Sequence, residues 1–303
     1  MSAVGEMVAP SFPHGVGYHG DLGLFSSRVA PQAPVSRTEA CIVLATLNEA
    51  TNLPRLLQEI ERGCDFPHEV VIVDDGSTDG TIDQIESWES GHPGVLPVLN
   101  RASNGLLNAR LQGLRWTRVR YAIVMDSDLQ HPPSAIPEIY AKLRQGYDMV
   151  VASRYTAGGS TTDRKLVRSI ISRGAAWLTH ALLPRTKHLS DPLSGFVGID
   201  LEVVKHNREG HLGFELVPFL LATNGKLRTC EIPYRFEERR HGDSKIVPGL
   251  AFVTTAFVFL RELLLDRHLA RAPRQPLHVD RFAFPGADQL AGSSAGVAGE
   301  NEQ

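Results

Sequence analysis

Cysteine is scarce in this sequence and cannot supply a disulfide framework. The 303 residues contain three cysteines, Cys41, Cys64 and Cys230, an odd number at wide spacings. Cys41 and Cys230 lie in apolar, strand-like runs, where a free cysteine behaves as a small buried hydrophobic residue. We therefore expect unpaired thiols and a reducing compartment.

A surplus of positive charge is also missing. The chain has 31 Lys and Arg residues against 34 Asp and Glu residues, and its formal net charge is -3. Proteins that bind nucleic acid through its phosphates gather basic residues on one surface, whereas here the two signs are dispersed. Nucleic acid is therefore not expected among the partners.

The apolar run that follows residue 245 is short. Residues 246–260 are uncharged and apolar, and a run of about fifteen residues falls short of the roughly twenty that span a bilayer. We expect a helix over 246–270 that either lies on a membrane surface or packs on the domain or on a partner. The N-terminus lacks the basic and apolar regions of a secretory signal. We therefore expect a cytoplasmic protein, with peripheral contact at the cytoplasmic membrane face if this helix binds lipid.

Glycine-rich phosphate loops are absent. The sequence contains no G-x-x-x-x-G-K-[ST] loop and no G-x-G-x-x-G after its first predicted strand. It also lacks an H-E-x-x-H zinc helix and a G-x-S-x-G nucleophile elbow. These absences argue against a P-loop enzyme, a dinucleotide-binding protein, a zincin and an α/β-hydrolase. If the protein binds a ligand with phosphate groups, we expect a metal ion to neutralise their charge.

What the sequence does have is an alternation of strand-like and helical patterns. Strands are predicted at residues 41–45, 69–73, 95–99, 122–125 and 149–152, and helices at 52–60, 81–88, 106–116 and 135–144. The alternation predicts an α/β fold: a Rossmann-like, mostly parallel sheet with right-handed crossovers and flanking helices.

The length suits one domain plus tails, and we place that domain at residues 38–245. Within it, the pattern is looser after residue 152, with helices predicted at 164–183 and 214–222 and a strand at 227–232. The ends of the chain, 1–37 and 271–303, are expected to be disordered because they mix Gly, Pro and Ser without apolar periodicity.

Two acidic pairs stand where predicted strands end. Asp126 and Asp128 follow the strand at 122–125, and Asp74 and Asp75 follow the strand at 69–73. An isolated Asp-x-Asp also occurs in turns and helix caps, but ligands of parallel sheets bind beyond the carboxyl ends of the strands. Carboxylate oxygens at that edge can hold a hard divalent cation against a phosphate. The two pairs therefore indicate a nucleoside-diphosphate site.

Several longer motifs carry a family resemblance. They are residues 46–50 (TLNEA), 73–81 (VDDGSTDGT), 126–133 (DSDLQHPP), 153–155 (SRY), 191–196 (DPLSGF) and 236–245 (FEERRHGDSK). With these motifs in this order, residues 39–245 resemble the family 2 glycosyltransferases of GT-A fold. Within that family they are most similar to the dolichol- or polyprenol-phosphate mannose synthases.

The resemblance implies a donor site and its metal. The residues that would bind the nucleotide are Thr46, Asn48, Glu49, Asp74, Asp75 and Asp126. Asp126, Asp128 and Gln130 would hold Mg²⁺ or Mn²⁺ through oxygen atoms against the donor diphosphate. Asp79, by contrast, is expected to be the N-cap of the following helix. GDP-mannose is the favoured donor.

The resemblance also implies an acceptor site built from cations. The residues that would bind the acceptor phosphate are Arg154, Arg168, Arg173, Ser194, Arg235, Arg239 and Lys245. Arginine is suited to forked contacts with phosphate oxygens, although many such residues are ordinary surface charges. Asp128, Arg239 and Lys245 are the expected catalytic residues.

The implied reaction is an inverting transfer of a hexose to a polyprenyl or dolichyl phosphate. Family members that act on a hydroxyl usually carry an acidic pair in the stretch that matches residues 213–218, where this chain has the single carboxylate of Glu215. A phosphate acceptor is already anionic near neutral pH and needs no base. Two alternatives stay open: transfer to a soluble small-molecule acceptor, and a non-catalytic lipid-binding scaffold of the same fold. The oligomeric state is not indicated.

Overall fold

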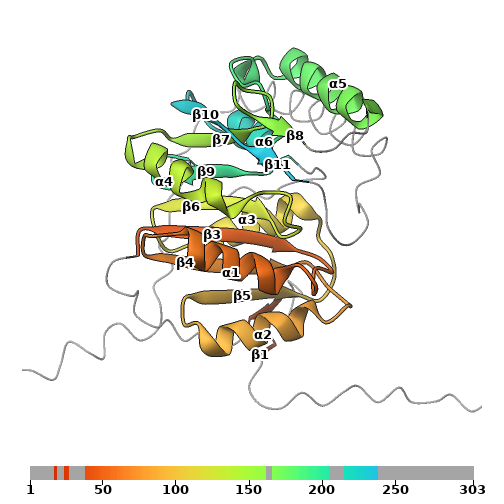
Figure 1. Ribbon diagram of the computed structural model, residues 1–303, viewed down its shortest axis with the longest axis vertical. Coiled ribbons are helices and arrows are strands. Elements are labelled where there is room, and N and C mark those ends of the chain that lie inside the picture. The colour runs from red at the N-terminus through yellow and green to blue at the C-terminus, as the bar shows by residue number, and fades with distance from the viewer. Residues whose placement is uncertain (1–16, 19–23, 27–37, 162–165, 205–214, 238–303) are drawn as a thin grey trace, which may run out of the picture. The chain divides into compact units, whose positions relative to one another are not determined.

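The computed structural model describes residues 17–18, 24–26, 38–161, 166–204 and 215–237 (Figure 1). The predicted helix over 246–270, the tail 271–303, and the site candidates Arg239 and Lys245 lie outside these residues. Among the helices that are described, none has the length and apolar character needed to cross a bilayer.

A sheet of nine strands forms the centre of the described structure (Figure 1). Its spatial order is β1-β2-β5-β4-β3-β6-β9-β7-β10. The strands are β1 (Gly17–Tyr18), β2 (Leu24–Ser26), β3 (Ala40–Thr46), β4 (His68–Asp74), β5 (Val95–Asn100), β6 (Tyr121–Asp126), β7 (Met149–Ser153), β9 (Val197–Asp200) and β10 (Thr229–Pro233). The pairs β3–β4, β3–β6, β4–β5 and β7–β10 are parallel. The predicted mostly parallel α/β fold is therefore confirmed.

Helices cover both faces of this sheet (Figure 1). They are α1 (Leu53–Gly63), α2 (Thr81–Gly91), α3 (Leu106–Trp116), α4 (Ile136–Arg144), α5 (Leu166–Leu182) and α6 (Leu216–Thr223). α3 has the predicted bounds, and α1 and α2 each run three residues beyond their predicted ends at 60 and 88.

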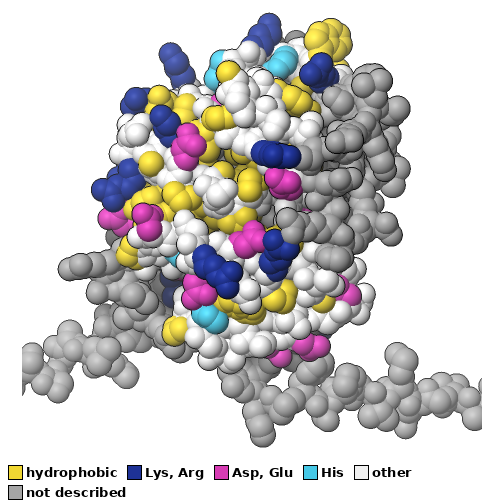
Figure 2. All heavy atoms as spheres, viewed as in Figure 1, with side chains coloured by type: hydrophobic (Ala, Val, Ile, Leu, Met, Phe, Trp, Pro, Cys, Tyr) yellow, Lys and Arg dark blue, Asp and Glu magenta, His cyan; other side chains and the backbone are white. Residues whose placement is uncertain are grey.

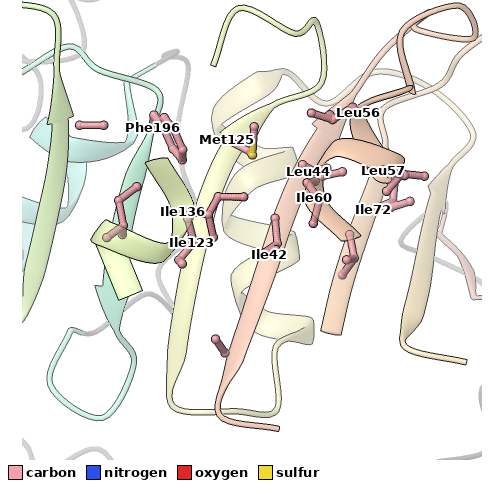
Figure 3. Close-up of a cluster of buried hydrophobic side chains, with 14 of the residues drawn as sticks. Ile42, Leu44, Leu56, Leu57, Ile60, Ile72, Ile123, Met125, Ile136 and Phe196 are labelled. Atoms are coloured by element: carbon pink, nitrogen blue, oxygen red, sulfur yellow. The ribbon is translucent and has the colours of Figure 1, made fainter. Parts of the chain in front are cut away.

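Strand β3 shows why a continuous apolar run is needed at the centre of such a sheet. Ile42 and Leu44 belong to a core layer with residues of α1, α2 and α4. Figure 3 shows part of this layer, with side chains of β3, α1 and α4 labelled. Val43 belongs to a second layer with residues of α3 and α6. Every residue of β3 is buried because helices pack on both of its faces.

Three features of the topology were not predicted. β9 inserts between β6 and β7 and runs antiparallel to both. The short strand β8 (Ser160–Thr161) pairs with β11 (Arg235–Phe236) in a separate two-stranded sheet. β1 and β2 lie in the segment 1–37, for which the sequence predicted no regular structure, and β2 pairs with β5 at the edge of the main sheet. An edge strand exposes unpaired backbone groups that a neighbouring segment can satisfy.

The described surface carries both signs of charge. In Figure 2, basic and acidic side chains are interspersed over the visible face and apolar side chains lie scattered among them. This distribution agrees with the dispersed charges in the sequence.

Candidate active site

The carboxyl ends of β3, β4 and β6 meet at one edge of the sheet. The strand register pairs Thr46 with Asp74 and Ala45 with Asp126. The buried Thr46 hydroxyl donates to Ser127 Oγ at 3.0 Å, and Ser127 Oγ donates to the Ala45 carbonyl oxygen at 2.9 Å. The two acidic pairs predicted from the sequence therefore belong to adjoining loops.

Asn48 and Glu49 join the loop after β3 to the loop after β4. Asn48 has a positive φ of 51°, and its side-chain oxygen accepts the Thr78 N–H at 2.7 Å. The Glu49 N–H donates to Thr81 Oγ1 at 2.8 Å, and its carboxylate accepts from Asn52 Nδ2 at 2.6 Å. Both predicted nucleotide-binding residues thus also fix the shape of this edge.

Asp74 and Asp75 have different surroundings. Asp74 is fully buried, and its Oδ1 accepts the N–H groups of Gly76 and Ser77 at 3.1 and 2.9 Å. Its Oδ2 is buried without a hydrogen-bond partner among the described residues. Burial raises the pKa of this carboxyl, against the lowering effect of hydrogen bonding from the Ser77 side chain and from those two N–H groups. Asp74 Oδ2 is therefore the acceptor of this carboxylate that makes no hydrogen bond within the described residues.

Asp75, in contrast, is saturated by the loop that precedes α3. Its carboxylate accepts the N–H groups of Asn104 and Gly105 at 2.8 and 3.1 Å and the Ser103 hydroxyl at 2.5 Å. Asn100 Nδ2 adds a longer contact of 3.4 Å. Asp75 thus fixes the conformation of the loop that leads into α3, in addition to any contact with a ligand.

Asp79 is not itself the N-cap of α2, which is Gly80 with a φ of 89°. Its Oδ1 accepts both the N–H and the hydroxyl of Thr81, at 3.1 and 2.5 Å, and its Oδ2 accepts the Ala50 N–H at 3.2 Å. The expected cap was therefore wrong by one position. The left-handed backbone at the N-cap favours glycine, and the Asp79 carboxylate hydrogen-bonds past Gly80 to Thr81.

Asp126 and Asp128 lie at the end of β6, as predicted. Asp126 has a 29% exposed side chain, and Asp128 is buried. Asp128 Oδ1 accepts the Gln130 N–H at 3.1 Å, and Leu129 between them has a positive φ of 63°. Gln130 Nε2 donates to the Glu237 carbonyl oxygen at 3.2 Å. The acidic loop is thereby tied to the chain segment after β11.

Arg110 is a site residue that the sequence analysis missed. It lies on α3, is 2% exposed, and donates from Nη2 to Asp126 Oδ1 at 2.6 Å. Its spacing from Leu107 and Leu114, both buried, places it on the apolar face of the helix. An arginine at an apolar position of a helix signals a buried anionic partner, and this was the available clue.

His131 links the acidic loop to an aromatic cluster. It is buried, its ring stacks on Phe196 with centroids 5.2 Å apart, and it meets Tyr234 edge to face at 5.8 Å. Its Nδ1 accepts the Asp126 N–H at 3.1 Å, which places the proton of the neutral ring on Nε2. Burial lowers the pKa of this imidazole, although the Asp126 and Asp128 charges act in the opposite direction.

Arg154 is held in a fork by Asp191. Its Nε and Nη2 donate to the two oxygens of that buried carboxylate at 2.7 and 2.8 Å. Glu231 on β10 accepts the N–H groups of Ser190 and Asp191 and so fixes the loop. The buried Ser194 closes the same loop, because its hydroxyl accepts the Phe196 N–H at 3.2 Å.

The other predicted acceptor cations are spread out. Arg173 lies over the ring of Tyr155, 5.9 Å from its centroid, and lines with Arg154 a hollow of about 530 Å³. Arg235, on β11, is exposed and pairs with Glu237 at 3.6 Å. Arg168 lies on α5. The described structure thus brings two of these cations, Arg154 and Arg173, to one hollow.

Glu215 interacts electrostatically with the charged residues of this region. It is the N-cap residue of α6 and is partly buried. The pKa of its carboxyl is raised to about 7, because burial and the charges of Asp126 and Asp191 outweigh the lowering effect of Arg110 and Arg154. A carboxyl near half-protonation at neutral pH therefore lies within electrostatic reach of the acidic loop.

The charges here suit a divalent cation. Among the described residues, two arginines and four acidic side chains interact here, and negative charge stays in excess even with Glu215 half-protonated; the residues are Arg110, Arg154, Asp126, Asp128, Asp191 and Glu215. No three His, Cys, Asp or Glu side chains of the described ranges form a closed metal cage. One or two carboxylates, completed by water and substrate phosphates, form the usual Mg²⁺ site of phosphate-handling enzymes. The Asp126 and Asp128 carboxylates fit that pattern.

Comparisons with known proteins identify the family of this chain. The model of the family described as Glycosyl transferase family 2 matches residues 41–206. A dolichol-phosphate mannosyltransferase of Pyrococcus furiosus is 31% identical over 242 residues, which cover 80% of this chain and 65% of the relative. An undecaprenyl-phosphate 4-deoxy-4-formamido-L-arabinose transferase of Edwardsiella ictaluri is 32% identical over 211 residues, or 67% of this chain and 62% of the relative. The chain thus spans less than two thirds of the length of both relatives.

A solved structure shares the fold. Glucosyl-3-phosphoglycerate synthase from Mycobacterium tuberculosis, crystallised with Mn²⁺, uridine diphosphate and glucosyl-3-phosphoglycerate, superposes with a TM-score of 0.53 at 19% identity. The superposition covers 75% of this chain and 80% of that one. At this level of identity the likeness is one of architecture.

Proposed function

The chain belongs to glycosyl transferase family 2, and from this premise we propose that it transfers a hexose from a nucleoside-diphosphate sugar to a polyprenyl phosphate. The observation that carries the proposal is the meeting of Asp126 and Asp128 with the buried Asp74 at one edge of the sheet. Both curated relatives act, by their names, on a lipid phosphate, but they differ in the sugar. The acceptor class is therefore better supported than the sugar.

On the donor side, Asp74 would accept an N–H of the nucleobase. Its Oδ2 lacks a partner among the described residues, and a guanine edge presents N–H donors that would satisfy it. Thr46, Asn48, Glu49 and Asp75 would shape the same pocket. GDP-mannose is the donor that we favour, because the Pyrococcus furiosus relative is a mannosyltransferase.

Asp126, Asp128 and Gln130 would hold Mg²⁺ or Mn²⁺ beside the donor diphosphate. When bound, such a cation neutralises the charge that builds up on the leaving nucleotide. His131 and Arg110 fix the main chain and the side chain of Asp126, so this carboxylate is positioned before any ligand arrives.

On the acceptor side, cations would orient the phosphate for attack on the anomeric carbon. Arg154 and Arg173 line one hollow, and Arg168, Ser194 and Arg235 lie on the segments around it. Arg239 and Lys245 complete the proposed set. A phosphate oxygen is already anionic, so a single displacement with inversion needs no proton transfer to the protein.

A hydroxyl acceptor is the second candidate, and Glu215 is the observation that favours it. A carboxyl whose pKa lies at about 7 could remove the proton of an attacking hydroxyl at neutral pH. Replacing Glu215 by Gln separates the two: transfer to a phosphate acceptor should survive, whereas transfer to a hydroxyl should fall by at least about 10²-fold.

Peripheral membrane contact is also proposed. Trp177 on α5 is 71% exposed and lines the hollow that contains Arg173. A tryptophan beside a cation is suited to the boundary between lipid and water. Flotation with anionic vesicles should carry the protein upward, and Trp177→Ala should reduce the floated fraction; equal flotation of both would count against this contact.

The transfer assay tests the proposal directly. Labelled GDP-mannose or UDP-glucose is incubated with the protein and Mn²⁺, with and without a short polyprenyl phosphate, and the organic phase is counted. We expect organic-soluble label only with the lipid phosphate, and its loss with a chelator. Label on an alcohol acceptor alone would favour the second candidate, and absence of nucleotide binding would favour a non-catalytic scaffold.

A further inference from the structure

Arg110, on α3, is a buried cation that contacts Asp126 at the start of the acidic loop. Its guanidinium lies 2.6 Å from Asp126 Oδ1, in a helix whose adjacent side chains belong to the core. The side chain is 3% exposed, against 29% for Asp126. The protein therefore covers the Arg110 side of this ion pair, and the exposed part of Asp126 is open to a ligand.

The main chain of Gly195 closes over this pair. A Cβ at that position would lie 2.5 Å from Arg110 Nη2 and 3.2 Å from Asp126 Oδ2. The guanidinium is thus enclosed between α3, β6 and the loop before β9. Arg110 is a fixed part of the site.

A permanent positive charge here has a thermodynamic consequence. A cation that approaches Asp126 meets a carboxylate whose charge is already shared with a guanidinium, and it is repelled by that guanidinium. The phosphates of a bound nucleotide would supply the missing negative charge. Ion and nucleotide would then bind together much more strongly than either alone, and such coupling is reciprocal.

We propose that Arg110 is a positioning residue that makes cation binding at Asp126 and Asp128 depend on the nucleoside diphosphate. The inference rests on the proposed metal-dependent function and adds a residue to it. It also gives a physical reason why the ion leaves after the nucleotide. Without the nucleotide phosphates, nothing offsets the repulsion between the Arg110 guanidinium and the cation.

Mn²⁺ binding, followed by the loss of the free-ion electron paramagnetic resonance signal, tests this without turnover. For the unaltered protein we expect Mn²⁺ to bind at least about tenfold more tightly with GDP than alone. In Arg110→Gln, Mn²⁺ alone should bind at least about tenfold more tightly than in the unaltered protein, because one positive charge beside a divalent ion is gone. Arg110→Lys, which keeps a positive charge at this position, should bind Mn²⁺ alone about as weakly as the unaltered protein.

Arg115→Gln is the matched control, since Arg115 is an exposed arginine on the same helix. Its Mn²⁺ affinity should stay within about twofold of the unaltered protein. Circular dichroism checks folding, and Arg110→Met, which leaves an apolar side chain of similar length, replaces Arg110→Gln if the latter does not fold. A folded neutral variant with unchanged or weaker affinity for Mn²⁺ alone overturns the role of Arg110 while leaving the proposed function in place. If the unaltered protein binds no Mn²⁺ even with GDP, the metal-dependent function itself fails, and the proposal fails with it.

Discussion

Gly195→Ala is the substitution that most directly perturbs the geometry of the site. Gly195 does not have a positive φ, so alanine fits its backbone and the effect comes from the added methyl group alone. That Cβ would lie 2.5 Å from Arg110 Nη2, whereas ordinary contacts begin at 3.4 Å. The guanidinium nitrogen must therefore retreat by about 0.9 Å, the difference between these distances, from a hydrogen bond of 2.6 Å.

The cost follows from this displacement. Overpacking of a close-packed site costs about 1–3 kcal/mol, and each kcal/mol lowers Tm by about 2–4 °C in a domain of this size. We expect Gly195→Ala to lower Tm by about 2–12 °C. Since misplacement of site groups by about 1 Å can cost 10²-fold, kcat/KM for sugar transfer should fall by about 10²-fold.

Calorimetry and the transfer assay measure the two effects, and Gly225→Ala is the control. A Cβ on Gly225 would meet nothing within 4 Å, so this variant should keep both Tm and activity. If Gly195→Ala kept full activity while folded, the Arg110–Asp126 geometry would not matter for transfer, and the reasoning would be refuted.

Three further predictions follow from other contacts. Asp191→Asn removes the charge that faces the Arg154 fork and should lower the free energy of unfolding in urea by about 3 kcal/mol; a loss below about 0.5 kcal/mol would contradict the ion pair's role. Glu215 is neutral below its pKa of about 7 and negative above it, and its negative form repels a phosphate acceptor. KM for that acceptor should therefore rise with pH through neutrality, and Glu215→Gln should abolish the rise. An identical pH profile in the variant would exclude this effect. Gly113→Ala would place a Cβ 2.3 Å from Val43 Cγ1 in the core, so the free energy of unfolding in urea should fall by about 1–3 kcal/mol; unchanged stability would be the contrary result.

Local sequence patterns were sufficient for much of the fold. α3 has its predicted bounds, and both acidic pairs lie at strand ends as expected, because apolar runs and helical periodicity are local signals. The insertion of β9 between β6 and β7 could not be predicted in this way. Strand order depends on contacts between segments far apart in the chain, which no local pattern encodes.

The candidate site was predictable to the same extent. Motifs located the carboxylates, but they did not show that Asp75 is saturated by the loop before α3 or that Arg154 is engaged by Asp191. Arg110 was missed because its partner, Asp126, lies on another element. Side-chain partnerships of this kind are set by tertiary packing, and the structure was needed to find them.

The central claim is that Asp126 and Asp128 hold a divalent cation against the phosphates of a nucleotide. Diffraction from crystals grown with Mn²⁺ and GDP, collected at the manganese absorption edge, tests it most directly. The account predicts an anomalous peak within about 2.0–2.6 Å of an Asp128 carboxylate oxygen and of a diphosphate oxygen. A bound nucleotide with no such peak, or with the ion held away from both carboxylates, would contradict it.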